Sequence, residues 1–131
     1  MLETREFQQF VKAPAKIRYE YFIQRVSKSQ EVWIVLDQSN HIKMAGDEED
    51  KILVPVWPFK EYAQCCLEED MDDCKIIAIP LDQFMNEFLI AMKKEGILSS
   101  VFWNGFDTTI IEVDQLLFDL KWQLSKYGMI H

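Results

Sequence analysis

The sequence predicts an α+β protein with an α/β-like C-terminal half, in which helices pack on a small mixed sheet. Short β-branched runs such as 52–56 and 75–79 have the length and continuity of buried strands. Apolar residues at helical spacing occupy the segments between these runs. Because strand–helix–strand connections are right-handed and place successive strands parallel, we expect the second half to form a parallel or mixed sheet.

Two helices are expected at the N-terminus, over residues 3–12 and 14–27. Pro14 suits the first position of a helix, where a missing N–H removes no hydrogen bond. Ile17 and Tyr21 lie on the back of the second helix and are placed to cover the first. The main apolar face of the second helix consists of Ala15, Tyr19, Phe22, Ile23 and Val26.

A β-hairpin is expected next, with strands at 31–36 and 41–44. The residues between them, Asp37-Gln38-Ser39-Asn40, favour turns. The loop 46–51 contains four consecutive acids but lacks the alternating ligands and terminal Glu of a calcium-binding loop, which favours a solvated turn. The acidic stretch 68–73 is interpreted in the same way, as a solvated corner or a contact for a basic partner.

The strand 52–56 carries Pro55, which cannot donate to a ladder, so we expect an edge strand or a bulge there. Pro58 then fits the first position of a helix that runs to about residue 69. Asp82 is a favourable N-cap for the following helix. The remaining elements are the strand 75–79, strands at 97–103 and 108–111, and a last helix from an Asp114 cap to Tyr127 with Gly128 as its stop.

The composition is that of one compact domain, residues 1–131, with 49% hydrophobic residues. A net charge of −8 and a pI near 4.7 disfavour nucleic acid and anionic membrane surfaces as partners, since both require a concentrated basic face. The sequence shows no leader pattern and no apolar run near the roughly 20 residues that a bilayer requires. Together with an odd number of cysteines, three, this predicts a soluble cytoplasmic protein.

The residue types that carry common chemistries are scarce, so no catalytic residue, metal site or cofactor is expected. The two histidines, His41 and His131, lie at poor positions for a general base. Cys65 and Cys66 are adjacent, so their side chains diverge by about 100° on a helix and do not suit one metal ion. Buried, inert thiols are therefore expected, with a cysteine-dependent enzyme as a minor alternative.

Two groups of residues are candidate binding sites. Ligands of parallel sheets bind beyond the carboxyl ends of the strands, where Trp57, Lys60, Trp103 and Asn104 are expected to line a crevice for an anion or a carboxylate. The plainer alternative is that both tryptophans are core and Lys60 is merely exposed.

The second group is on the last helix. Phe118 and Trp122 lie one turn apart, nearly opposite the stripe that docks this helix, which favours a homodimer or another protein partner. Alternatively, the N-terminal helices cover them. The stripe itself consists of Val113, Leu117, Leu120, Leu124 and Tyr127.

Three segments carry a resemblance to a known family. They are Glu31-Val32-Trp33, the run from Val54-Pro55-Val56-Trp57-Pro58 to Ala63, and Ile79-Pro80-Leu81-Asp82. Over roughly residues 21–120 the chain resembles the bacterial family catalogued as domain of unknown function number twenty-seven fifty. The resemblance implies a bacterial origin and a fold, but no activity. A looser likeness, at the level of fold, is to the N-terminal domain of the enhanced serine sensitivity proteins.

Two functions follow from the sequence. The first is a non-enzymatic interaction protein, an adaptor or immunity-like acidic module, that dimerises through Phe118 and Trp122. The alternative is a small-ligand binding protein that uses the rim at Trp57, Lys60, Trp103 and Asn104.

Overall fold

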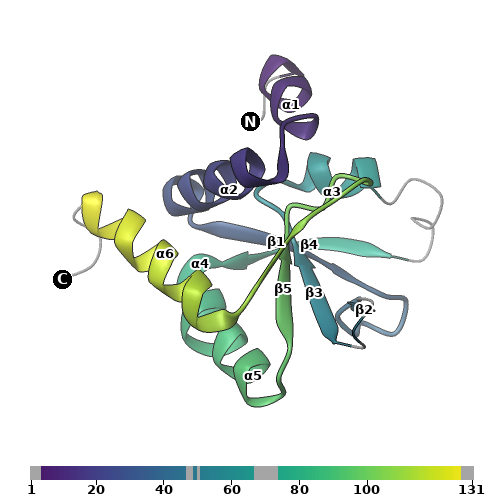
Figure 1. Ribbon diagram of the computed structural model, residues 1–131. Helices are drawn as coiled ribbons and strands as arrows, with labels where there is room; N and C mark the ends of the chain where they lie inside the picture. Colours follow the sequence, from purple (N-terminus) through teal and green to yellow (C-terminus); the bar gives the residue numbers. More distant parts are fainter. Residues whose placement is uncertain (1–3, 47–48, 50, 67–73, 128–131) are drawn as a thin grey trace.

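The computed structural model describes residues 4–46, 49, 51–66 and 74–127, which fold into helices packed on two sheets (Figure 1). The helices are α1 (Thr4–Val11), α2 (Ala15–Ser29), α3 (Lys60–Cys66), α4 (Leu81–Gln83), the π-helical turn η2 (Phe84–Phe88), α5 (Leu89–Lys94) and α6 (Val113–Lys126). The strands are β1 (Glu31–Leu36), β2 (Ala45–Gly46), β3 (Ile52–Val56), β4 (Lys75–Pro80), β5 (Leu98–Val101) and β6 (Thr109–Ile111). The predicted α+β class, with two N-terminal helices and a C-terminal helix, is confirmed.

The larger sheet has the strand order β2-β3-β5-β6, and β1 and β4 form a second, antiparallel sheet. Within the larger sheet only β3 and β5 run parallel, so this sheet is mixed as expected. A single antiparallel bridge between Trp33 and Trp57 joins the two sheets. Figure 1 shows α2, α5 and α6 on the same side of β3 and β5. Val54 and Val56 of β3 are buried together with Leu116 and Leu120 of α6.

The predicted hairpin is only partly correct. The turn forms, because Asp37 Oδ1 accepts hydrogen bonds from the N–H groups of Ser39 and His41. However, β1 pairs along its whole length with β4, and the segment 41–44 makes only an isolated bridge, from Ile42 to Leu36. The chain leaves β1 after this bridge and pairs as β2 with β3.

The prediction that successive strands are parallel is wrong for β3 and β4. The chain leaves β3 through α3, adds β4 to β1 in antiparallel orientation, and returns as β5 beside β3. The physical reason is the position of β1, whose free edge offers β4 a six-residue antiparallel ladder. Such an edge lies in a distant part of the sequence and is not visible in a local pattern.

Pro55 is accommodated without an edge position, because β3 has partners on both sides. The backbone carbonyl of Val56 points toward β5, because it accepts a hydrogen bond from the N–H of Phe102. Backbone groups alternate along a strand, so Pro55 faces the opposite side. On that side Leu53 pairs with Ala45 of β2 and Trp57 bridges to β1, which leaves the ladder interrupted at Pro55.

Several predicted boundaries shift by one to a few residues. Helix α3 begins at Lys60, two residues after Pro58. Pro80, and not Asp82, is the N-cap of α4, and Glu112 is the N-cap of α6. Pro14 is likewise a cap and not the first helical residue. The acidic stretch 68–73, most of the acidic loop 46–51, the end of the helix predicted to reach residue 69, and Gly128 lie outside the described residues.

An aromatic cluster fastens α1 to the rest of the molecule. Phe10 stacks on Tyr21 with 4.0 Å between ring centroids, which agrees with the predicted cover of the first helix by Tyr21. The hydroxyl of Tyr21 donates to Glu6 and lies 2.9 Å from that of Tyr62. Burial raises the pKa of Tyr62 to about 12 and also raises the pKa of Tyr21, where the hydrogen bond to Glu6 acts in the same direction.

These tyrosines predict a loss of stability in alkaline solution. Their pKa values in the folded state lie above the value of 10.0 for a free side chain, so unfolding releases protons once the pH exceeds about 10. We therefore expect the urea concentration at the midpoint of unfolding to stay constant below pH 10 and to fall as the pH rises toward 12. Tyr62→Phe should show a shallower fall. A parent midpoint that is equal at pH 9 and pH 11.5 would contradict the burial of these hydroxyls.

Candidate functional site

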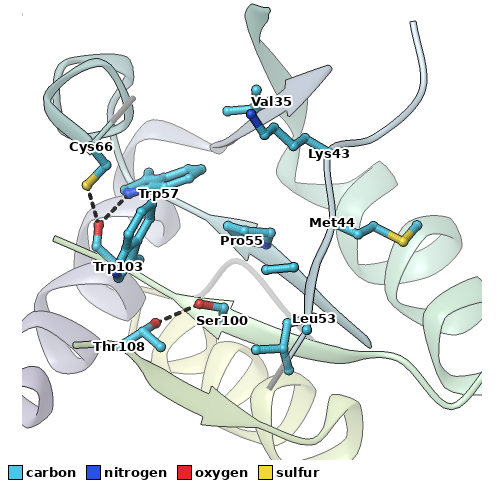
Figure 2. A pocket seen from close by; sticks show the side chains of 12 residues that line it. Val35, Lys43, Met44, Leu53, Pro55, Trp57, Cys66, Ser100, Trp103 and Thr108 are labelled. Atoms are coloured by element: carbon cyan, nitrogen blue, oxygen red, sulfur yellow. Dashed lines mark hydrogen bonds between the residues drawn. The ribbon is translucent and has the colours of Figure 1, made fainter. Parts of the chain in front are cut away.

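A hollow of about 400 Å³ lies beside the interrupted ladder at Pro55 (Figure 2). Its lining comes from β1, the segment 43–46, β3, α3, β5 and the loop after β5. The lining residues are Val35, Lys43, Met44, Ala45, Gly46, Leu53, Pro55, Trp57, Cys66, Ser100, Trp103 and Thr108. Most of these side chains are apolar, so the hollow offers a largely apolar surface.

The floor of the hollow is one face of the larger sheet. Leu53 and Pro55 are two apart on β3 and therefore point to the same face. Ser100 of β5 pairs with Pro55, and its hydroxyl lies 2.8 Å from that of Thr108. The Thr108 hydroxyl in turn donates to the carbonyl of Val101, so Ser100 is the donor of the first pair. Both hydroxyls are thus satisfied within the protein.

One wall of the hollow is formed by Trp57 and Trp103. Trp57 is only 1% exposed, and its Nε1 donates to the Trp103 carbonyl over 2.8 Å. The Sγ of Cys66 lies 2.9 Å from the same carbonyl and donates to it (Figure 2). Two donors from separate elements therefore fix the backbone of Trp103, and the two indoles lie close together beside the hollow.

The thiols differ from the expectation that all are buried. Cys65 is exposed, whereas Cys66 and Cys74 are partly buried. Burial raises the pKa of Cys66 to about 12, so this residue is a neutral thiol at physiological pH. Since the thiolate is the nucleophile of cysteine enzymes, Cys66 lacks the protonation state that such an enzyme requires.

Lys43 is the one charged side chain among the described residues that line the hollow. Its Nζ lies 3.8 Å from Cys74 Sγ, a weak contact that leaves the ammonium able to meet a ligand. Sequence reasoning missed this residue. Nothing in the local pattern around 43 distinguishes it from any other lysine in a connection between strands.

The four residues of the predicted rim separate into two pairs. Trp57 and Trp103 line the hollow, whereas Asn104 and Lys60 do not. Asn104 uses its side chain within the protein, because Nδ2 donates to the Val11 carbonyl over 2.8 Å and Oδ1 accepts from the N–H groups that follow in the loop. Lys60 is exposed at the start of α3. The structure thus replaces Lys60 with Lys43 as the cation of this hollow.

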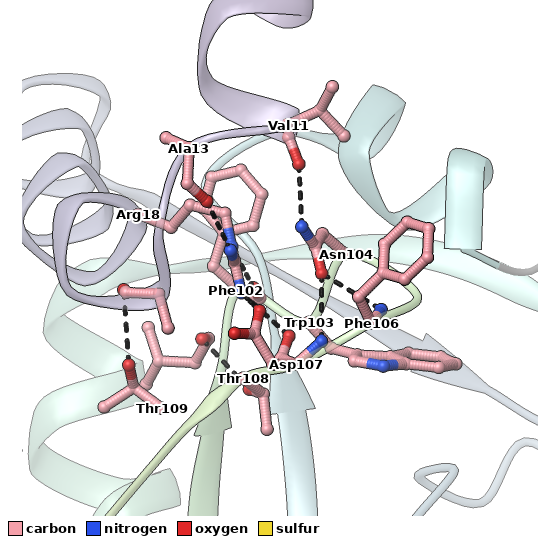
Figure 3. A network of polar contacts seen from close by, with 12 residues as sticks. Val11, Ala13, Arg18, Phe102, Trp103, Asn104, Phe106, Asp107, Thr108 and Thr109 are labelled. Atoms are coloured by element: carbon pink, nitrogen blue, oxygen red, sulfur yellow. Dashed lines mark hydrogen bonds and ion pairs between the residues drawn. The ribbon is translucent and has the colours of Figure 1, made fainter.

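A buried arginine holds the loop that carries Trp103 (Figure 3). Arg18 of α2 is 1% exposed, and its Nε donates to the carbonyl of Phe102 over 3.0 Å. Its two terminal nitrogens donate to the carbonyls of Ala13, at 2.6 Å, and Asp107, at 2.8 Å. Phe102 has a φ of 57°, a left-handed conformation that is uncommon for a non-glycine residue. Sequence reasoning did not single out Arg18.

Comparison with known proteins identifies the family of this chain. A family model described as "Protein of unknown function (DUF2750)" matches residues 19–120, which is most of the chain. This chain belongs to the DUF2750 family. The resemblance noted in the sequence is thereby confirmed, whereas the looser likeness to the enhanced serine sensitivity proteins stays a prediction. No protein in the curated set is similar enough in sequence to count as a relative.

The residues around the hollow fall within the part that matches DUF2750. Lys43, Trp57, Cys66 and Trp103 are all inside the matched range, and Arg18 directly precedes it. In the described part of this DUF2750 protein, no three or more His, Cys, Asp or Glu side chains gather closely enough to hold a metal ion. No helix in the same part has the length and apolar character needed to cross a membrane.

The predicted surface on α6 is exposed in this DUF2750 protein. Phe118 is 64% exposed and Trp122 is 54% exposed, so the N-terminal helices do not cover them. The Nζ of Lys126 lies 3.6 Å from the centroid of the Trp122 ring, a cation–π contact. The docking side of α6 buries Leu116 and Leu120 completely.

Proposed function

We propose that this DUF2750 protein binds a small, mainly apolar molecule with one acidic group in the hollow beside Pro55, without catalysing a reaction. The observation that carries the proposal is an apolar hollow of about 400 Å³ with a single charged side chain, Lys43, in its described lining. Ligand sites of proteins are typically about 300–1,000 Å³, mostly apolar, with a few polar groups that orient the ligand.

The lining also favours a flat apolar group on the ligand. The indoles of Trp57 and Trp103 form one wall, and aromatic rings favour stacked or edge-to-face contacts with other rings. The hydroxyls of Ser100 and Thr108 bind one another and do not compete for a polar ligand. The acidic group is therefore expected at Lys43 and the apolar group at the indoles.

The lining supports binding without catalysis. The described lining contains no His, Asp or Glu, the side chains that most often act as general acids and bases. Cys66, its one thiol, has a pKa raised to about 12 by burial and is protonated at neutral pH. As part of the proposal we place the protein in a reducing bacterial cytoplasm, which its three free cysteines support.

Matched pairs of acidic and neutral probes test the proposal. Indole-3-acetate and octanoate are compared with indole-3-acetamide and 1-octanol by isothermal titration calorimetry and by tryptophan fluorescence. We expect saturable binding of the acids and weaker binding of the neutral analogues. Lys43→Met should weaken binding of the acids by roughly tenfold, because one charge-assisted hydrogen bond is lost. Lys60→Met is the matched control and should bind as the parent does.

Two outcomes would contradict the proposal. Equal affinity of Lys43→Met and the parent for the acids would remove Lys43 as the recognition group. Ala45→Trp places a large side chain in the lining of the hollow, so unchanged binding in this variant would place the ligand elsewhere. Because Ala45 is exposed, the variant is expected to fold, which thermal unfolding checks.

A second candidate function, a protein-interaction or adaptor module, is favoured by a different observation. Two large aromatic side chains, Phe118 and Trp122, are exposed one turn apart on α6. Aromatic residues are enriched at protein interfaces. Light scattering on the parent and on Trp122→Asp tests this candidate as a homodimer: an unchanged monomeric mass in both forms would contradict it.

A further inference from the structure

The hollow is open at one end, where it continues into a groove of about 1000 Å³. The two spaces are contiguous, because they share four described lining residues, Gly46, Leu53, Trp103 and Thr108. The groove adds side chains from β5, from β6 and from the connection between these strands. A ligand in the hollow therefore has room to extend beyond it.

The cation of the hollow lies at the end away from this opening. The Nζ of Lys43 is 3.8 Å from the Sγ of Cys74, which directly precedes β4 of the smaller sheet. Leu53 and Thr108, which also line the groove, lie on β3 and just before β6 of the larger sheet. Figure 2 shows Lys43 well separated from both, with Pro55 between. An acidic group held by Lys43 therefore directs the rest of the ligand past Pro55 toward the groove.

The floor of the hollow and the floor of the groove are one continuous face of the larger sheet. Pro55 of β3 pairs with Ser100 of β5, and Ser100 pairs with Ile110 of β6, so the three side chains point to the same face. Leu53 and Leu98 form a second pair on this face. Apolar side chains thus lead from the hollow into the groove without a break between the strands.

The groove exposes some of its apolar side chains to water. Ile110 is 43% exposed, and Phe106, in the loop that leads to β6, is 93% exposed. Contact with an apolar chain would remove part of this surface from water, which is favourable. The groove therefore suits the apolar tail of a molecule whose other end lies in the hollow.

The charges of the groove limit what the far end of such a molecule carries. The charged residues in the described lining are three acids and one lysine, namely Glu49, Asp107, Glu112 and Lys51. Even when the ion pair of Asp107 with the buried Arg18 is included, the acids are in excess. A second acidic group on the ligand is therefore disfavoured at this end.

We propose that the ligand is an elongated amphiphile with one acidic head group, whose apolar chain runs from the hollow into the groove. This inference rests on the proposed function, because the head group is the acid that Lys43 binds. Trp103 lines both spaces, so the chain leaves the hollow along this side chain. A short acid such as octanoate occupies the hollow alone.

A series of straight-chain acids tests the proposal. Dissociation constants of octanoate, dodecanoate and hexadecanoate are measured by isothermal titration calorimetry, below the concentrations at which the acids form micelles. Each CH₂ group that leaves water for an apolar surface tightens binding by up to about fourfold. We therefore expect affinity to rise through the whole series, with hexadecanoate at least about 100-fold tighter than octanoate.

One variant separates the groove from the hollow. Ile110 lines the groove but not the hollow, so Ile110→Asp should weaken hexadecanoate binding at least about tenfold and leave octanoate binding unchanged. Lys43→Met, by contrast, should weaken both acids by the same factor. Ile90→Asp is the matched control, because Ile90 is 39% exposed on α5 and lines neither space. Circular dichroism checks that each variant is folded.

The outcomes distinguish this inference from the proposed function. Equal affinity of the parent for octanoate and hexadecanoate would overturn the inference and leave the hollow as a site for short acids. An Ile110→Asp variant that affects both acids equally, or neither, would also overturn it, because the chain would then not lie in the groove. If neither acid bound to the parent, the proposed function would fail and this inference with it.

Discussion

Replacing Arg18 with methionine is expected to lower the free energy of unfolding by about 3 kcal/mol, measured by urea denaturation. The guanidinium is 1% exposed and donates to the carbonyls of Ala13, Phe102 and Asp107. Methionine fills similar space but leaves the buried Phe102 carbonyl and the partly buried Ala13 carbonyl without this donor, and it removes the ion pair with the Asp107 carboxylate. Lys16→Met on the same helix is the control, because Lys16 is exposed, and it should change stability by less than about 0.5 kcal/mol.

Arg18→Met is also expected to make the loop that carries Trp103, in the wall of the hollow, more mobile. Arg18 bonds on both sides of Trp103, to Phe102 and to Asp107, so its loss frees the loop that positions this indole. Arg18→Lys should recover only part of the stability, since one ammonium cannot reproduce a planar fork of donors. Equal stability of Arg18→Met and Lys16→Met would show that these hydrogen bonds do not hold the loop.

Trp57→Ala is expected to destabilise the protein by about 4 kcal/mol, as is usual for the removal of a buried aromatic side chain. Trp57 is 1% exposed, and its Nε1 donates to the Trp103 carbonyl. Trp57→Phe should cost less, because it keeps most of the apolar contact and Cys66 still donates to that carbonyl. Chemical denaturation followed by circular dichroism avoids the change in fluorescence that these variants cause.

Phe106→Ala provides the comparison for this prediction. Phe106 is 93% exposed, so its removal should leave the free energy of unfolding nearly unchanged. If Trp57→Ala and Phe106→Ala were equally mild, the tight burial of Trp57 between β3 and the loop after β5 would be wrong.

The sequence was sufficient for features that depend on neighbouring residues. The N-terminal helices and α6 follow from apolar spacing over several turns, and the exposure of Phe118 and Trp122 follows from their position opposite Leu120. The pairing of β4 with β1 did not follow. Strand order depends on which edges remain free after the chain has folded, and such edges are properties of the whole molecule.

Two of the four residues that the sequence predicted for the candidate site line the hollow. Trp57 and Trp103 were found because both follow predicted strands, and the structure brings them together. Lys43 was missed because it reaches the hollow only when the chain crosses from β1 to β3. Arg18 was missed because its partners at Phe102 and Asp107 lie more than eighty residues away, and nothing near Arg18 marks it as buried.

The gap at Pro55 has a consequence for how the hollow admits a guest. Since position 55 has no donor, β1 and β2 are unable to merge into one continuous partner strand for β3. The missing hydrogen bond at Pro55 is therefore fixed by covalent structure, whether or not the hollow is filled. A molecule that binds there does not need to break any hydrogen bond of the sheet. Its binding therefore does not require local unfolding.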